Sequence, residues 1–320
     1  MLPEFSPRPW GTFDLSPIYP QHKFNEKIGE AWLTGDECRV ANGPLAGQRI
    51  ADLAGNFGRE LVGEAAPDPK LFPLLTKFLF PHDKLSVQVH PDDECARRVG
   101  QPWGKTECWY VLDAKPGAQV ALGLKTGTTR AQLQEAIRQN KAEDLLNWIT
   151  VHTGEMIYVA AGTVHAITGG SILVETQQSS DTTYRLYDYG RPRELHLERG
   201  MEAVKETTSA GKVECSHATK DGRTELISAQ YFAVDKFQLD GPQALTTIGE
   251  DQRSSVQILI ALNGCGVVET RSAEPVTFTR GDAVVVPAWM GEFHLRPQWE
   301  LEFLRARVPG RPYPEPVTTI

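Results

Sequence analysis

Short segments in which apolar and polar residues alternate recur along most of the chain, and glycine and proline separate them. Alternation with a period of two is typical of a strand that buries one face. The 28 glycines and 22 prolines supply turn residues between these segments. The pattern predicts strands at residues 85–89, 107–113, 119–122, 156–160, 171–175, 183–189, 256–262, 283–286 and 301–306.

Two segments have a helical pattern instead. Residues 69–78 are short and apolar, and residues 129–149 open with Thr129, a good N-cap, followed by apolar residues at mostly helical spacing. We expect one helix in the first segment and two short helices, interrupted near Asn140, in the second. Many strands with one helical insert predict an all-β barrel or sandwich. The polar residues 210–222 are expected to form a connector.

One strand pattern occurs twice. Residues 154–161 (GEMIYVAA) are echoed by residues 281–288 (GDAVVVPA), and each copy is followed by a histidine, His165 or His294. Another strand that ends in a turn precedes each copy. This arrangement resembles the cupin double-stranded β-helix, present twice. We therefore predict a mainly β chain built from tandem cupin-like barrels with a small helical insert.

The first segment with candidate chemistry is residues 84–90 (KLSVQVH). Strict alternation places Ser86, Gln88 and His90 on one face of a strand and the apolar residues on the other. A half-exposed surface strand shows the same pattern. Histidine and glutamine on one face, however, also offer two groups that can ligate a metal.

Two further segments add candidate ligands. Lys105 and Glu107 share a strand face, as an ordinary surface ion pair also would, and His165 follows a glycine turn, where a lone histidine is more often structural. Taken together, His90, Glu107 and His165 supply two imidazoles and one carboxylate, with Gln88 as a fourth candidate. These nitrogen and oxygen ligands suit zinc or another divalent first-row metal and leave positions for substrate or water.

The second copy of the repeat contains His294 without a matching set of ligands, so we interpret His294 as structural. We predict a metal-bearing catalytic domain at residues 1–215, with the helical insert near residues 129–149. A cupin-like barrel without a metal is predicted at residues 216–320.

The polar, aromatic-rich residues 175–191 are too hydrophilic for a simple core strand. Within them, Arg185 either pairs with an aspartate, the usual partner of an arginine, or points into the cavity toward an anion. The composition of the segment does not choose between these two positions.

Charge and cysteine content narrow the class of protein. The net charge of -8 argues against a nucleic-acid partner, and an anionic substrate would need a local basic pocket. The five cysteines are scattered without a CxxC pair, which indicates reduced thiols. No secretory signal and no apolar run of about 18 residues is visible. We therefore expect a cytoplasmic protein that binds neither nucleic acid nor membrane.

Four blocks, LSVQVHPDDECA, GKTECWYVLDA, AGTVHAI and ETQQSSDTTYRLYDYGR, resemble in sequence and order the diagnostic blocks of type I mannose-6-phosphate isomerases in their short bacterial form. The resemblance extends from about residue 8 to about residue 200. It implies one zinc ion per chain, bound by Gln88, His90, Glu107 and His165. It also implies catalytic roles for Arg185 and Lys105. The substrate contacts that it implies are Ser86, Lys77, Lys105 and Arg185.

The resemblance further implies that the enzyme interconverts D-mannose 6-phosphate and D-fructose 6-phosphate by metal-assisted proton transfer through a cis-enediol. The expected partner is a small sugar phosphate. Lys105, a metal-bound water and a carboxylate such as Asp181 all remain candidates for the general base. Larger family members carry a longer helical insertion than residues 129–149.

Two other functions fit part of the pattern. A cupin with two histidines and a carboxylate is also typical of an iron dioxygenase, which would consume oxygen. A non-catalytic sugar-binding protein could keep the same fold. The lysines and arginines around the predicted ligands favour a phosphorylated sugar over a hydrophobic oxygenase substrate.

Overall fold

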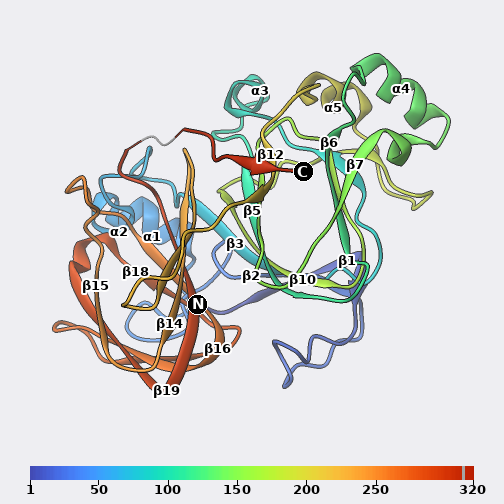
Figure 1. The fold of residues 1–320 in the computed structure, drawn as a ribbon. Helices are drawn as coiled ribbons and strands as arrows, with labels where there is room; N and C mark the ends of the chain where they lie inside the picture. Colours follow the sequence, from blue (N-terminus) through green and yellow to red (C-terminus); the bar gives the residue numbers. More distant parts are fainter. Residues whose placement is uncertain (312–313) are drawn as a thin grey trace.

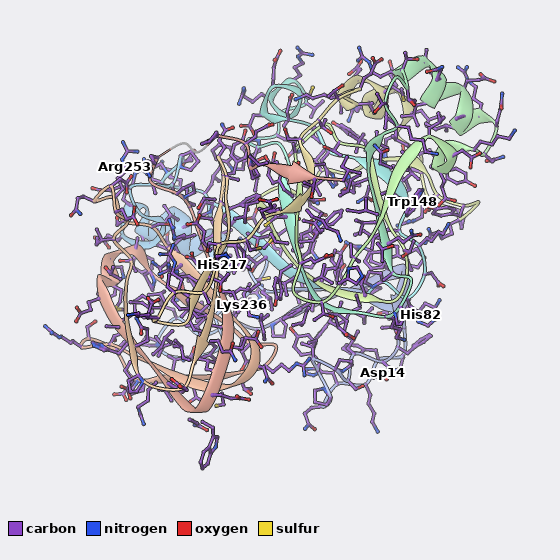
Figure 2. The ribbon with its side chains drawn as sticks, in the orientation of Figure 1. Asp14, His82, Trp148, His217, Lys236 and Arg253 are labelled. Carbon is purple, nitrogen blue, oxygen red and sulfur yellow. The ribbon has the colours of Figure 1, made fainter. Side chains whose placement is uncertain are left out.

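The computed structural model describes residues 1–311 and 314–320. Strands dominate, and they form two barrels that lie side by side (Figure 1). Side chains occupy the interior of both barrels (Figure 2). The predicted mainly β architecture with two barrels in tandem is confirmed.

The first barrel consists of two antiparallel sheets. One has the strand order β1-β2-β3-β10-β5-β8-β12-β20, and the other has the order β11-β4-β9-β6-β7. The strands of the larger sheet are β1 Glu4–Thr12, β2 Ile28–Trp32, β3 Leu74–Leu79, β10 Ser171–Gln178, β5 Glu107–Ala114, β8 Met156–Val159, β12 Ala210–Val213 and β20 Thr318–Thr319. Those of the smaller sheet are β11 Tyr184–Tyr187, β4 Val87–Val89, β9 His165–Ile167, β6 Gln119–Leu124 and β7 Leu146–Thr150.

The second barrel is one seven-stranded antiparallel sheet that curls around its own core of phenylalanine, leucine and valine side chains. Its central path is β13-β14-β19-β16-β17, with β15 beside β19 and β18 beside β16. The strands are β13 Arg223–Ser228, β14 Ala233–Leu239, β15 Gln243–Thr246, β16 Gln257–Glu269, β17 Val276–Thr279, β18 Ala283–Val286 and β19 Glu292–Arg307.

The helices are short and lie outside the barrels (Figure 1). They are α1 Ile50–Phe57, α2 Arg59–Val62, α3 Asp93–Arg98, α4 Arg130–Arg138 and α5 Leu197–Ala203, with 3-10 turns η1 Ala142–Leu145 and η2 Ala288–Met290. None of the helices in the described residues is long and apolar enough to cross a bilayer. A cytoplasmic location stays a prediction.

The helix predicted at residues 69–78 is wrong. Residues Leu74–Leu79 form β3, which lies between β2 and β10 and is buried along its whole length. Because both faces of β3 are buried, its sequence LLTKFL lacks the regular alternation of apolar and polar residues that identifies a half-exposed strand. A short apolar run of this kind cannot be distinguished from a buried helix by periodicity.

The insert at residues 129–149 is only partly helical. Thr129 forms a capping box with Gln132 and begins α4, and the break near Asn140 is confirmed, since Asn140 has a φ of 58°. The second predicted helix is wrong beyond the single turn η1. Trp148 and Ile149 belong to β7, which pairs with β6. Pairing with a neighbouring strand therefore outweighs the local helical spacing.

The connector predicted at residues 210–222 also begins as a strand. Ala210–Val213 form β12, which pairs with β8 and with the C-terminal β20. Residues 214–222 contain neither helix nor strand. The predicted connector is therefore confirmed for residues 214–222 and wrong for residues 210–213.

The two barrels are joined by more than the connector. Leu15 and Ile18, near the N-terminus, belong to the same buried cluster as Ile258 and Leu304 of the second barrel. Lys236 of β14, labelled between the barrels in Figure 2, places its ammonium 5.8 Å from the ring centre of Tyr110 on β5. Residues near the N-terminus thus pack against the second barrel, and the C-terminal strand β20 pairs with the first barrel. The domain boundary near residue 215 stays a prediction.

Candidate active site

Three predicted metal ligands meet inside the first barrel. His90 directly follows β4, Glu107 begins β5 and His165 begins β9. Their candidate ligand atoms lie within 4.8 Å of one another, and all three side chains are buried. Within residues 1–311 and 314–320, this is the only group of three or more His, Cys, Asp or Glu side chains that could hold a metal ion.

Backbone carbonyls orient the two imidazoles. His90 Nδ1 lies 3.0 Å from the carbonyl oxygen of Thr182, and His165 Nδ1 lies 2.9 Å from that of Thr163. Because a carbonyl can only accept, both Nδ1 atoms carry the hydrogen. The Nε2 lone pairs then face Glu107, each 3.4 Å from one of its carboxylate oxygens. This orientation is typical of imidazoles that bind a metal.

The protonation states also fit a metal site. Burial lowers the pKa of His90 well below its usual value, and the charge of Lys105 lowers it further. Burial lowers the pKa of His165 to about 4, so both rings are neutral at neutral pH, as ligation requires. Burial raises the pKa of Glu107 well above its usual value, and a divalent cation beside it would favour the ionised form. Two neutral imidazoles and one carboxylate fit zinc.

Gln88 adds a fourth donor from β4, directly opposite His165 in the register with β9. Its Nε2 lies 3.1 Å from His165 Nε2, and its Oε1 accepts from the Ser86 hydroxyl at 3.1 Å. Half a turn of the carboxamide exchanges oxygen and nitrogen, and a hydroxyl can pair with either. Gln88 can therefore present its oxygen to a metal while keeping Ser86 as a partner. Ser86 does not line the cavity described below, and its contact with substrate stays a prediction.

Lys105 lies at the centre of a buried ion network. Its ammonium donates to the carboxylates of Glu107 and Glu175 and lies 3.1 Å from His90 Nε2. Burial opposes the charged form, but the two carboxylates outweigh it and raise the pKa of Lys105 above its usual value. In this network Lys105 is a fixed cation, which argues against its use as a free base.

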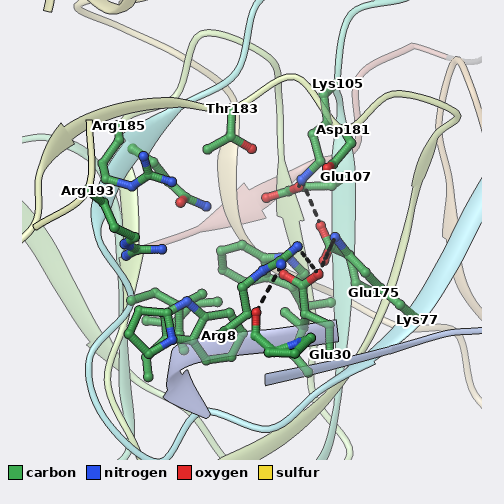
Figure 3. A pocket seen from close by; sticks show the side chains of 18 residues that line it. Arg8, Glu30, Lys77, Lys105, Glu107, Glu175, Asp181, Thr183, Arg185 and Arg193 are labelled. Carbon is green, nitrogen blue, oxygen red and sulfur yellow. Dashed lines mark hydrogen bonds and ion pairs between the residues drawn. The ribbon is translucent and has the colours of Figure 1, made fainter. Parts of the chain in front are cut away.

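A cavity of about 400 Å³ opens beside these groups and is lined by both sheets of the first barrel (Figure 3). On the smaller sheet, Arg185 of β11 pairs with Gln88, and Gln88 pairs with His165, so the three side chains form one row across the sheet. On the larger sheet, Lys77 of β3 lies opposite Glu175 of β10, with the ammonium 3.3 Å from the carboxylate. The two sheets thus place charged groups on both walls of one cavity.

Arg185 and Arg193 lie together on the side of the cavity opposite Glu107 (Figure 3). Arg193 donates to both carboxylate oxygens of Asp188 at 2.7 Å. Arg185 instead donates to the backbone carbonyl of Glu194 at 2.8 Å, and in the described part of the chain it has no carboxylate partner and no partner for its buried Nε. Burial, and then Arg193, lower the pKa of Arg185. The sequence leaves open whether Arg185 pairs with an aspartate or points into the cavity. In the structure it lines the cavity.

Comparison with known proteins identifies the family to which this arrangement belongs. A mannose-6-phosphate isomerase of Bacillus subtilis is 34% identical over 310 residues, which cover 92% of this chain and 94% of that protein. A mannose-6-phosphate isomerase of Streptococcus mutans is 34% identical over 289 residues, which cover 87% of this chain and 88% of that protein. The chain belongs to the mannose-6-phosphate isomerase family.

Solved structures agree with this assignment. The crystal structure of the mannose 6-phosphate isomerase of Bacillus subtilis has a TM-score of 0.84 at 30% identity and covers 95% of this chain and 97% of that chain. A zinc-bound mannose 6-phosphate isomerase shares the fold, with a TM-score of 0.74 at 15% identity, and covers 94% of this chain and 97% of that chain. No family model matches the chain. The predicted family and the tandem cupin-like fold are confirmed.

Several residues that line the cavity of this isomerase were not predicted from the sequence, among them Glu30, Trp109, Glu175 and Arg193. Trp109 lies two residues after Glu107 and so shares its strand face, and its buried Nε1 has no partner among the described residues. Glu175 begins the polar run at residues 175–191 and Arg193 lies two residues beyond its end, so this run was the available signal. Glu30, which accepts from Arg8 at 2.9 Å, has no comparable sequence signal.

A chain of hydrogen bonds connects the second barrel to the active-site strand. Tyr231 Oη donates to Asp93 Oδ2 at 3.0 Å. Asp93 Oδ1 in turn accepts from the Gly104 N–H at 2.8 Å and from Gln178 Nε2 at 2.9 Å. The Gln178 Oε1 accepts from the Thr106 N–H at 2.9 Å. These bonds fix the backbone on both sides of the active-site lysine of this family member.

Proposed function

We propose that this isomerase interconverts D-mannose 6-phosphate and D-fructose 6-phosphate. One cavity is lined by Glu107 of the His-Glu-His cluster, which is suited to a divalent ion, and by Arg185, a guanidinium that has no acidic partner in the described residues. A sugar phosphate supplies a matching group for each, an oxygen-rich carbon chain and a dianionic phosphate. Relatives that are 34% identical to this chain are named for this isomerisation.

The metal in this proposal is one zinc ion per chain. His90 and His165 would supply nitrogen ligands, and Glu107 and Gln88 would supply oxygens. When bound, the ion acts as a Lewis acid that stabilises negative charge on a substrate oxygen. The carbonyl contacts on both Nδ1 atoms support this role, because they fix the rings in the ligating orientation.

The phosphate in this proposal lies on the side of Arg185 and Arg193. Arg185 has unused donors there, and its neighbour adds positive charge. Anchoring the phosphate at this side directs C1 and C2 of the sugar toward the opposite side, where Lys105 and Glu107 lie (Figure 3). The unpaired Nε1 of Trp109 is a further donor for a sugar oxygen.

The reaction moves a proton from C2 of the aldose to C1 through a cis-enediol, while the hydroxyl proton of O2 moves to O1. Three of the four carboxylates that line the cavity are engaged: Glu30 and Glu175 by cations, and Glu107 by the ligand cluster. Asp181 makes no side-chain hydrogen bond to the described residues and is the carboxylate free to carry this proton. The fixed charge of Lys105 would stabilise the enediolate oxygen.

The direct test is a coupled assay that follows fructose 6-phosphate formed from mannose 6-phosphate by the purified, metal-loaded protein. We expect one zinc ion per chain, loss of turnover after chelation and its return when zinc is restored. A fully loaded protein that does not convert mannose 6-phosphate would refute the proposed function. Unchanged turnover after complete removal of the metal would refute only the role of zinc and would leave the proposed isomerisation standing.

The base is tested separately by Asp181→Asn. We expect turnover to fall about 10²-fold to 10⁴-fold with little change in KM or zinc content, because the amide cannot accept the C2 proton. Asp113→Asn, at an exposed aspartate of β5, is the matched control. Equal turnover of the two variants would remove Asp181 from the reaction.

A further inference from the structure

The second barrel has a cavity of its own, of about 410 Å³. It is lined by residues of β13, by the loop after β15, by the first residue of β16 and by the end of β19. Arg253, on this loop, is labelled at the edge of the second barrel in Figure 2. None of its lining residues belongs to the active-site cavity of the first barrel.

Three arginines converge behind this cavity on one buried acid. Asp235 of β14 accepts from Arg305 at 2.6 Å and 3.1 Å and from Arg223 at 2.8 Å. Arg307 comes no closer to Asp235 than 3.8 Å, beyond hydrogen-bonding distance. The strand register explains the cluster, because Asp235 lies directly opposite Arg305, and Arg307 is two residues further along the same face of β19.

This cluster has more donors than its acid can use. A carboxylate has about four acceptor positions, whereas each guanidinium has five N–H donors. Arg305 and Arg223 together make three hydrogen bonds to Asp235, and the guanidinium of Arg307 has no hydrogen-bond partner among the residues that the structure describes. Arg307 is therefore not needed to neutralise Asp235, and its donors remain available on the cavity side.

One residue that lines the same cavity, Gln257, has an unpaired acceptor. Gln257 is 2% exposed, and its Nε2 donates to the Thr246 carbonyl at 2.6 Å. Its Oε1 is buried and has no partner within residues 1–311 and 314–320. A buried acceptor without a partner is uncommon in native proteins and indicates a missing donor. A hydroxyl group of a bound molecule would supply that donor.

The charge of the cavity also favours an anion. Five arginines line it against three acidic side chains, with Asp235 beneath. With Asp235 counted, the ratio is five basic to four acidic groups, which equals the ratio among the residues that line the active-site cavity. In a chain of net charge -8, two separate cavities thus carry a local excess of positive charge.

We propose that this cavity, the arginine cavity lined by Arg223, Gln257, Arg305 and Arg307, is a second binding site that takes a small hydroxylated phosphomonoester. The guanidiniums match phosphate oxygens, for which arginine provides paired, directed donors. The Gln257 Oε1 accepts from a hydroxyl of the same molecule. The site is separate from the isomerase cavity and does not depend on the reaction proposed for it.

The test uses the full-length, zinc-loaded protein in the Arg185→Gln background, which weakens anion binding in the first barrel. Glycerol 3-phosphate is titrated by calorimetry, with inorganic phosphate as a probe without the extra hydroxyls. We expect about one equivalent of glycerol 3-phosphate to bind. Adding Arg307→Gln should weaken this binding at least about tenfold, because a charge-assisted contact is lost. Adding Arg296→Gln, on an exposed arginine of the same strand, should leave it unchanged.

Two further measurements test the same site. Gln257→Met should weaken glycerol 3-phosphate more than inorganic phosphate, since only the former can donate a hydroxyl. In the native background, Arg307→Gln should keep the isomerase turnover, which shows that the chain is folded. Absence of binding in the Arg185→Gln protein, or equal binding by the variants with Arg307→Gln and with Arg296→Gln, would overturn the proposal.

Discussion

The two barrels enclose cavities of similar volume and each buries a carboxylate beneath its cavity, yet the surroundings of the two acids differ. Glu107 of the first barrel has one cationic partner, Lys105, and two neutral imidazoles, whereas the hydrogen-bond donors to Asp235 of the second barrel are arginines alone. Neutral imidazoles leave lone pairs that can bind a cation together with the acid. Guanidiniums have none, and their fixed charge repels a cation. The barrel fold therefore does not by itself specify a metal site. The side chains around the buried acid determine whether a cation can bind there.

The histidine of the second repeat shows the same difference. His294 is exposed on β19, with no ligand cluster around it in the described residues, whereas His165 is fully buried beside Glu107. The two sequence repeats thus share a strand pattern and a histidine but not the position of that histidine relative to the cavity. A sequence repeat in this chain is evidence for architecture and not for chemistry.

The largest expected effect removes the metal cluster of the first barrel. His90→Ala should abolish stoichiometric zinc binding and lower turnover at least about 10³-fold, because one ligating nitrogen is lost. The second barrel should stay folded, since its core contains no residue of this cluster. Zinc analysis and the coupled assay measure the effect, with the exposed His152→Ala as control. A His90→Ala protein that retains one tightly bound zinc would contradict the cluster.

Arg185→Gln should have the next largest effect. It tests whether the phosphate side of the first cavity acts separately from the metal side. We expect normal zinc content and a fall in kcat/KM of about 10³-fold, because the phosphate loses a charge-assisted contact. Arg185→Lys should recover only part of it, since lysine lacks the planar pair of donors. Steady-state kinetics beside the exposed Arg138→Gln control provides the measurement. Full activity of Arg185→Gln would exclude this arginine from substrate binding.

The second barrel is tested through its buried acid. Asp235→Asn should lower the free energy of unfolding by about 3 kcal/mol, because Arg305 is left buried without a counter-charge. Denaturant unfolding at neutral pH, with zinc content as a check on the first barrel, measures this loss. An unchanged free energy of unfolding would show that the arginines do not depend on Asp235.

The same variant makes a pH prediction. Burial raises the pKa of Asp235, but Arg305 and Arg223 outweigh it and hold the pKa below its usual value. Such a group stabilises the fold above its unfolded pKa of about 3.9, and this stabilisation is lost as the pH falls toward the lower pKa of the folded state. The native chain should therefore lose more stability than Asp235→Asn between about pH 5 and pH 3. Parallel pH profiles of the two would contradict this assignment.

The smallest expected effect concerns the connection between the barrels. Tyr231→Phe removes the hydroxyl that donates to Asp93 and leaves the backbone around Lys105 less firmly held. We expect turnover to fall about two- to tenfold, equivalent to about 1 kcal/mol, with zinc content unchanged. Ser216→Ala, which removes an exposed hydroxyl of the same barrel, should have no effect on turnover. Equal kinetics of the two variants would show that the Tyr231–Asp93 hydrogen bond does not affect catalysis.

Sequence alone could predict the metal cluster because each candidate ligand lies in or beside a predicted strand. Period two assigns Gln88 and His90 to one face, and the chemistry of these residues with Glu107 and His165 points to a metal. The family resemblance then adds Arg185. These steps need only local patterns and the known preferences of metal ions.

The remaining features depend on which strands become neighbours. Lys77 meets Glu175 only because β3 pairs with β10, and Tyr231 meets Asp93 only because the barrels pack together. Neither register nor packing between distant segments is encoded in local periodicity. The wrong helix at residues 69–78 has the same origin, since burial of both faces of β3 removes the alternation that would identify a strand.

The proposed function depends on two imidazoles and one acid that hold a divalent ion in the first barrel alone. Anomalous diffraction from crystals of the zinc-loaded protein tests it most directly. We expect one strong peak per chain, about 2.0–2.2 Å from His90 Nε2, His165 Nε2 and a Glu107 oxygen, with none in the arginine cavity. A peak elsewhere, or full activity in crystals without a peak at this position, would contradict it.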